Sequence, residues 1–171
     1  MTLTSPAIAA PPAPQPPQGA TGTGGRVGRP ARLLLGLVVG ALLLTGCLSS
    51  NAQSFVDRTN ALRASDGVAA VAGHGVLDAK AQAWAENLAA RGGLVHSDLA
   101  DGLGGVRWRA LGENLAAGTE SGDWPARLHD ALVNSPSHRA NMVDQRFTHM
   151  GVGVASGGGQ VYVVEVFAEI R

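Results

Sequence analysis

The chain has 171 residues, a length that suggests one domain with an additional terminal segment. Hydrophobic residues make up 45% of it and charged residues 15%, a composition typical of a folded globular protein and not of a disordered chain. The 13 basic and 13 acidic residues balance, and they form neither a basic patch nor an aromatic platform, which argues against a nucleic-acid partner.

The first 47 residues have the organisation of an export signal. Residues 1–25 are uncharged and rich in Pro, Gly and Ala, which predicts disorder. Arg29 and Arg32 then precede an apolar run, LLLGLVVGALLLTGC, at residues 33–47. The run is shorter than the roughly 20 residues of a membrane span, and its basic flank and small-residue end are typical of a secretory signal. We therefore predict a disordered leader with a basic n-region at 1–32 and a signal peptide at 33–47.

Cys47 is the only cysteine, so no intramolecular disulfide can form. It closes the apolar run in the sequence LTGC (44–47), which resembles the lipobox of bacterial lipoproteins, where cleavage precedes the cysteine and its sulfur is lipidated. The resemblance predicts a lipid on Cys47, the membrane as a partner and an extracytoplasmic location on the bacterial cell membrane. A plain signal-peptidase site with a chance cysteine, which gives a secreted protein, is the alternative.

Downstream of a short linker at 48–53, we expect one folded domain at 54–171. Helical spacing of apolar residues and capping residues predict three helices, over residues 54–67, 78–91 and 124–133. Ser54 is expected as the N-cap of the first helix, and Trp84 in the second is expected in the core and not as a ligand platform. The stretch 93–118 is expected to be mostly loop, with one short helical turn at 111–117.

The last part of the chain is expected to contain one more helical turn and then strands. Ser135 can cap a turn that begins at Pro136 and carries His138. Residues 149–155 and 160–170 are rich in β-branched residues and are joined by SGGG (156–159), which predicts a β-hairpin. Helices followed by an antiparallel hairpin give an α+β fold.

The five histidines differ in how strongly they indicate function. His96 and His138 lie beside loop or helix-start residues, where functional side chains concentrate, so they are the candidates for a site. His74 and His129 are expected at the surface, one in a Gly-rich loop and the other on a helix. His149 precedes a strand and fits either role.

Glu113, in the sequence LGENL, has two interpretations that the sequence leaves open. Its carboxylate can bond backbone amides, or it can face a histidine, fix the tautomer of the imidazole and raise its basicity. Two histidines and a carboxylate have the composition of a zinc site, but His96, Glu113 and His138 are widely spaced and no HExxH pair is present. A serine triad is weaker still, because no GxSxG elbow accompanies Ser135 or Ser137.

Four stretches occur in an order that resembles the bacterial branch of the CAP superfamily, also called SCP-like extracellular domains. They are LVHSDL (94–99), LGENLAAG (111–118), NSPSHRANMVDQRFTHMGVGVA (134–155) and YVVEVFAE (162–169). The resemblance covers roughly residues 54–170 and implies an α-β-α sandwich with a central antiparallel sheet.

The same resemblance implies a surface cleft with two histidines and two acids. His96, Glu113 and His138 match three of these four groups, and Asn114 and Ser135 are expected to line the cleft. The second acid is absent, because Ser135 or a neighbour falls where the family carries it. Animal members also have disulfides, which this chain cannot form.

Some members of the family bind divalent metal, often zinc, through the paired histidines, and others bind sterols or fatty acids. We therefore expect an extracytoplasmic lipoprotein whose cleft binds zinc or another divalent cation through His96 and His138, or a small or lipidic ligand. A metal-assisted envelope hydrolase acting on peptide, lipid or cell-wall material is one alternative, with Glu113 as general base or orienting group. A structural or interaction domain without catalysis is the other, so the sequence leaves open whether the protein is an enzyme.

Overall fold

The computed structural model describes residues 49–171. This part of the chain forms four helices and four strands, in the order α1 (Ser50–Ser65), β1 (Ala72–Gly73), α2 (Gly75–Arg91), β2 (Trp108–Thr119), α3 (Trp124–Val133), α4 (Pro136–Met142), β3 (His149–Gly157) and β4 (Gln160–Ile170). The leader at 1–32, the signal peptide at 33–47 and the lipidation of Cys47 lie outside the described residues. Within residues 49–171, no helix has the length and apolar content that a membrane crossing requires.

The sheet has the strand order β1-β3-β4-β2. Strand β4 is antiparallel to both of its neighbours, β2 and β3, and β3 and β4 form the predicted hairpin. An antiparallel sheet was expected. The two-residue strand β1 pairs with β3 in parallel, so the sheet is mixed. The predicted α+β class is confirmed.

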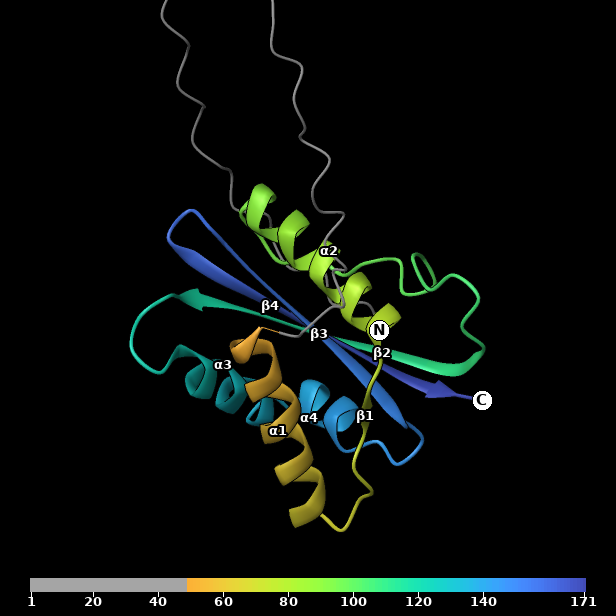
Figure 1. The fold of residues 1–171 in the computed structure, drawn as a ribbon. Helices are drawn as coiled ribbons and strands as arrows, with labels where there is room; N and C mark the ends of the chain where they lie inside the picture. The colour runs from red at the N-terminus through yellow and green to blue at the C-terminus, as the bar shows by residue number, and fades with distance from the viewer. Residues whose placement is uncertain (1–48) are drawn as a thin grey trace, which may run out of the picture. The chain divides into compact units, whose positions relative to one another are not determined.

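The sheet is the middle layer of an α-β-α sandwich, as predicted. Figure 1 shows α2 on one face and α1, α3 and α4 on the other. Alternate residues of β4 enter two separate cores, because successive side chains of a strand point to opposite faces. Val161, Val163 and Phe167 join the core beneath α1 and α3, whereas Tyr162, Val164, Val166 and Ala168 join the core beneath α2.

Helix α2 lies unusually close to β3. A Cβ atom on Gly151 or Gly153 would come within 2.2 Å of the α2 backbone, and one on Gly157 within 2.5 Å. Two side chains of α2 also complete the outer edge of β3 beyond the short β1. Asp78 accepts a hydrogen bond from the Val152 amide, and Gln82 bonds the amide and carbonyl of Val154. The helix therefore takes the place of a neighbouring strand there and closes the edge.

Helix α1 begins four residues earlier than expected. Its N-cap is Ser49, whose hydroxyl accepts a hydrogen bond from the Ala52 amide at 3.2 Å. Ser54 lies within the helix and accepts instead from the Arg58 guanidinium. The helix is capped by Ser49 and not by the predicted cap Ser54. Residues 50–53, which were expected to belong to a linker, are therefore helical. Helix α2 likewise begins earlier, at Gly75, and ends at Arg91 as predicted, with Gly92 as its C-cap.

Residues 108–119 form strand β2, so the predicted loop with a helical turn at 111–117 is wrong. The sequence WRALGENLAAGT lacks the β-branched residues that indicate a strand. Its conformation comes from tertiary pairing, since β2 runs antiparallel along the whole of β4 from Thr119 opposite Gln160 to Trp108 opposite Ile170. This correction matters for the site, because Glu113 and Asn114 lie at the middle of β2.

Candidate functional site

The candidate site lies at the edge strand β2, where the two helical layers approach the same edge of the sheet. Successive residues of a strand point to opposite faces, so Glu113 and Asn114 face different layers. Glu113 lies on the face whose core includes Leu115 and α2, and Asn114 lies on the face of α4. The loop that carries His96 comes from the α2 side, whereas His138 is on α4.

Glu113 holds the loop that contains His96. Its carboxylate accepts three hydrogen bonds: at Oε1 from His96 Nδ1 (2.7 Å) and the Ser97 amide (3.0 Å), and at Oε2 from the Ser97 hydroxyl (2.6 Å). Both interpretations of Glu113 therefore occur together, since it bonds a backbone amide and also faces a histidine. The expectation that this contact lies on a helical turn is wrong, because Glu113 is on a strand.

The His96–Glu113 pair joins a buried carboxylate to an exposed imidazole. The Glu113 side chain is 1% exposed and the His96 side chain 65%. An ionised carboxylate can only accept hydrogen bonds, so the contact places the imidazole proton on Nδ1. Nε2 of His96 is then left with its lone pair, which is the state that binds a cation.

Two residues of α2 fix the same loop from the other side. Trp84 donates its indole N–H to the Val95 carbonyl at 2.9 Å. Lys80, the only lysine of the chain, donates its ammonium group to the carbonyls of Asp98 and Asp101 at 2.7 and 2.8 Å. Trp84 also packs against the α2-side core, as predicted. The role of Lys80 was missed, and its single occurrence was the only signal that the sequence offered.

His138 lies near His96 and is half-buried on α4. Burial lowers the pKa of His138, and coulombic repulsion from His96, when that ring is also protonated, lowers it further. Both burial and coulombic repulsion favour the neutral imidazole of His138. Coulombic repulsion acts only between neighbouring groups. His138 is therefore close enough to His96 for the two rings to interact electrostatically, although they come from opposite layers of the sandwich.

A buried polar network lies beneath His138. The Asn114 amide nitrogen donates to the His138 carbonyl (3.1 Å) and to Glu165 Oε2 (3.0 Å), and its oxygen accepts from Asn141 (3.0 Å). Glu165 is fully buried on β4, and burial raises the pKa of this carboxyl to about 7, against the opposing effect of the hydrogen bond from Asn114. Glu165 was missed as a site residue, although an acid among the inward residues of a strand was visible in the sequence.

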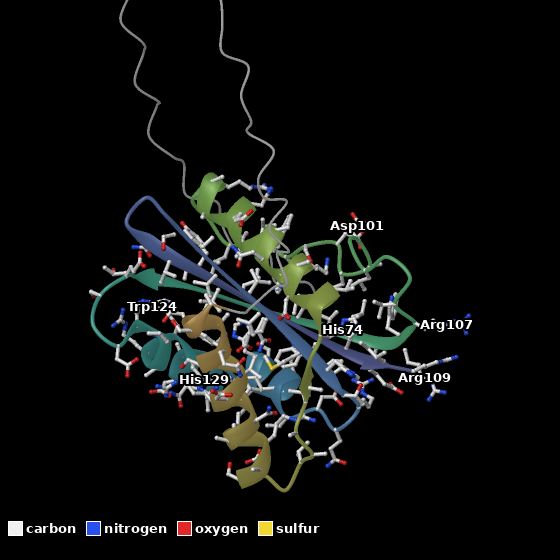
Figure 2. All side chains as sticks on the ribbon, in the orientation of Figure 1. His74, Asp101, Arg107, Arg109, Trp124 and His129 are labelled. Atoms are coloured by element: carbon white, nitrogen blue, oxygen red, sulfur yellow. The ribbon has the colours of Figure 1, made fainter. Side chains whose placement is uncertain are left out.

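The remaining predicted residues lie elsewhere or have other roles. Ser135 is the N-cap of α4, but its side chain makes no capping hydrogen bond. His74 and His149 lie at β1 and β3, with ring centroids 5.6 Å apart. His129 is 5% exposed and its ring is 6.2 Å from that of Phe55, so its predicted surface position is wrong. Figure 2 shows His129 and Trp124 on α3 beside α1.

The donor set at His96 and His138 is limited to imidazoles. Among residues 49–171, no three His, Cys, Asp or Glu side chains are grouped so that they could hold a metal ion. The Glu113 oxygens are already occupied by hydrogen bonds from His96 and Ser97. The residues present therefore fit a cation held by two protein ligands, and do not supply the three or four protein ligands of catalytic or structural zinc sites.

A three-layer α-β-α domain with a histidine–glutamate pair at the edge of its sheet is the class that this fold and site define. Residues 56–167 match CAP, the cysteine-rich secretory protein family. The chain belongs to this family, as the ordered motifs predicted.

The protein YkwD of Bacillus subtilis strain 168 is 37% identical to the chain over 54 residues. That match covers 32% of this chain but only 20% of YkwD. Most of the length of YkwD thus has no counterpart in the match.

Solved structures show the same fold at low identity. An outer surface protein of Borrelia burgdorferi has a TM-score of 0.61 at 17% identity, covering 71% of this chain and 93% of the Borrelia protein. An extracellular SCP-domain protein of Bacillus anthracis has a TM-score of 0.58 at 24% identity, covering 72% and 45%. NaASP2, whose crystal structure contains Zn²⁺, has a TM-score of 0.55 at 19% identity, covering 73% and 83%.

Proposed function

We propose that the protein is an extracytoplasmic CAP-domain binding protein in which His96 and His138 bind a divalent cation such as Zn²⁺. The observation that carries this proposal is the contact of 2.7 Å between the buried Glu113 carboxylate and Nδ1 of the exposed His96. A carboxylate behind an imidazole is the usual second-layer partner of a metal-binding histidine, because it fixes the ring and raises the basicity of the other nitrogen. The presence of Zn²⁺ in the NaASP2 structure is consistent with this chemistry.

Binding is better supported than hydrolysis. A metal-assisted hydrolase needs a general base with a free carboxylate oxygen or imidazole nitrogen near the reacting water. Both oxygens of Glu113 already accept hydrogen bonds, and no third metal ligand accompanies the two histidines among the described residues. A bound cation would therefore keep positions open for water or for an exogenous ligand.

Zinc binding by the full chain is the direct test, measured by isothermal titration calorimetry. We expect one Zn²⁺ per chain, with affinity at least about tenfold weaker in His96→Ala and in His138→Ala, because each variant removes one of two ligands. Glu113→Gln should weaken binding less, since its amide oxygen still accepts from His96 Nδ1.

The matched control is His149→Ala, because His149 and His74 form the other close pair of histidine rings. This variant should bind Zn²⁺ as the wild type does. Loss of binding in His149→Ala, with normal binding in His96→Ala, would assign the cation to the other pair and contradict the proposal.

The extracytoplasmic location is supported by the family and by the surface and extracellular proteins of the same fold. We propose further that Cys47 carries the lipid that the sequence LTGC indicates. In bacterial cells fed with radioactive palmitate, the wild type should be labelled and should sediment with membranes, because a covalent lipid adds about 0.8 kcal/mol of membrane affinity per buried CH₂. Cys47→Ser should lose both properties, and equal labelling of the two proteins would exclude lipidation at this residue.

A further inference from the structure

We infer that Glu165 and Asn114 are positioning residues for His138, acting from inside the sandwich through the backbone of α4. The inference rests on the proposed function of His138 as a cation ligand. Glu165 is then an acid behind the second histidine, at a position other than the one near Ser135 where the family's second acid was expected. Glu165 itself touches neither histidine ring and acts only through Asn114.

Glu165 occupies a position that otherwise favours an apolar residue. It lies on β4 between Val163 and Phe167 on the face that forms the core beneath α1 and α3. Its direct cross-strand neighbours are Val152 on β3 and Asn114 on β2. It is 0% exposed, and among the described residues its Oε1 has no hydrogen-bond partner. Such burial of a half-satisfied carboxyl is unfavourable, so packing alone does not account for this side chain.

Among the described residues, the single hydrogen bond of the Glu165 side chain connects it through Asn114 to α4. Oε2 accepts from Asn114 Nδ2 at 3.0 Å, and the second N–H of the same amide donates to the His138 carbonyl at 3.1 Å. With its nitrogen turned to Glu165, the amide presents its oxygen to Asn141, one turn further along α4, at 3.0 Å. Asn141 also donates to the Glu113 carbonyl, at 3.3 Å.

Glu165 and the His138 carbonyl together hold the Asn114 amide in one orientation, because both accept from its nitrogen. If the amide were reversed, its oxygen would face the carboxyl group and the His138 carbonyl, and its nitrogen would face the Asn141 amide nitrogen. The ionised carboxyl at position 165 strengthens this preference, since it can only accept hydrogen bonds. Residues 138 and 141 of α4 are then held to β2 in one register, which fixes the backbone that carries the His138 ring.

The test compares Glu165→Leu with Glu165→Gln. Leucine fills the buried space and removes a half-satisfied carboxyl, but it also takes the acceptor from one Asn114 N–H, so the two effects on stability oppose each other. We therefore expect Glu165→Leu to remain folded but to bind Zn²⁺ about tenfold more weakly, the loss typical of a residue that positions a metal ligand. Glu165→Gln should restore wild-type affinity, because its amide oxygen can accept from Asn114.

A second readout does not depend on zinc. In the metal-free full chain, NMR should show a shifted His138 ring signal and faster amide exchange over residues 138–142 in Glu165→Leu, but not in Glu165→Gln. The matched control is Thr59→Val, which removes another buried polar atom without a hydrogen-bond partner among residues 49–171. That variant should leave both the His138 signal and the amide exchange unchanged.

The outcomes separate the inference from the proposed function. If the wild type binds no Zn²⁺, the proposed function fails, while the NMR comparison still decides whether Glu165 positions α4. If Glu165→Leu changes neither the His138 signal nor the exchange of α4, the positioning role is wrong. Should Glu165→Leu not fold, Asn141→Ala replaces it, since it removes another of the three partners of the Asn114 amide. Unchanged His138 signals in that variant would overturn the inference equally.

Discussion

Arg63→Ala is expected to lower the free energy of unfolding by about 4 kcal/mol, because it removes a buried cation from four backbone acceptors. Arg63 is 1% exposed at the end of α1. Its guanidinium donates to four carbonyl groups of other segments, at distances of 2.7 to 3.1 Å, those of Ala69, Met142, Asp144 and Phe147. The side chain thus joins α1 to the end of α4 and to the turn that enters β3.

These carbonyls lie in turns or at a helix end, where backbone partners are scarce. The Asp144 carbonyl also accepts from the Phe147 amide, at 3.2 Å, whereas the other three depend on the guanidinium. Its removal leaves them unsatisfied and also leaves a cavity. Burial lowers the pKa of Arg63 and the nearby Asp144 opposes this shift, but an arginine stays charged at neutral pH. Arg63→Lys should recover part of the loss, since one ammonium group cannot reach all four acceptors.

Urea unfolding followed by circular dichroism gives the comparison. The control is Arg58→Ala on the same helix, where the arginine is more than one third exposed and lies 3.8 Å from Asp123. The control should lose no more than about 1 kcal/mol. If Arg63→Ala lost as little as Arg58→Ala, the four hydrogen bonds would not be a principal support of the fold.

Gly153→Ala is the second substitution with a large expected effect, a loss of about 3 kcal/mol or more in the free energy of unfolding. A Cβ atom at this position would lie 2.2 Å from the carbonyl carbon of Ala81 and 2.3 Å from its oxygen. These are backbone atoms of α2, so no side-chain rotation can relieve the clash. Either the helix moves away from the sheet or the strand distorts.

Displacement of α2 would also affect the candidate site. Lys80 and Trp84, which hold the loop around His96, are on the same helix. We therefore expect Gly153→Ala to lower the melting temperature and also to increase amide exchange around His96. Gly105→Ala is the control, since nothing lies within 4 Å of its added methyl group. Equal melting temperatures for the two variants would show that α2 can move at little cost.

The local signals of the sequence were sufficient for several elements. Pro125 and Pro136 at the starts of α3 and α4, and the alternation around the glycine turn of β3 and β4, predicted those segments because they act within a few residues. Strand β2 lacked such a signal, since it is a strand only through its pairing with β4. His129 was misjudged because a histidine was expected to face water, whereas it shares the buried face of α3 with Trp124 and Leu128.

The candidate site was predictable only in part, because some of its contacts join residues that are far apart in the sequence. The motifs indicated His96, Glu113 and His138, and the histidine–carboxylate contact was one of two open interpretations. The groups that hold them in place bond mainly to backbone carbonyls of distant loops or helices, as Lys80 does at Asp98 and Asn114 does at His138. Such partners leave no residue type in the sequence to recognise, so they emerge only from the folded structure.

The early start of α1 shortens the segment between Cys47 and the folded domain. With Ser49 as the helix cap, only Leu48 separates the cap from Cys47. Two residue steps extend at most about 7 Å. On the proposal that Cys47 is lipidated, the domain would have almost no tether: it could diffuse laterally in the membrane plane but could not extend outward to distant layers of the envelope. Its encounters would then be restricted to ligands within one domain diameter of the bilayer.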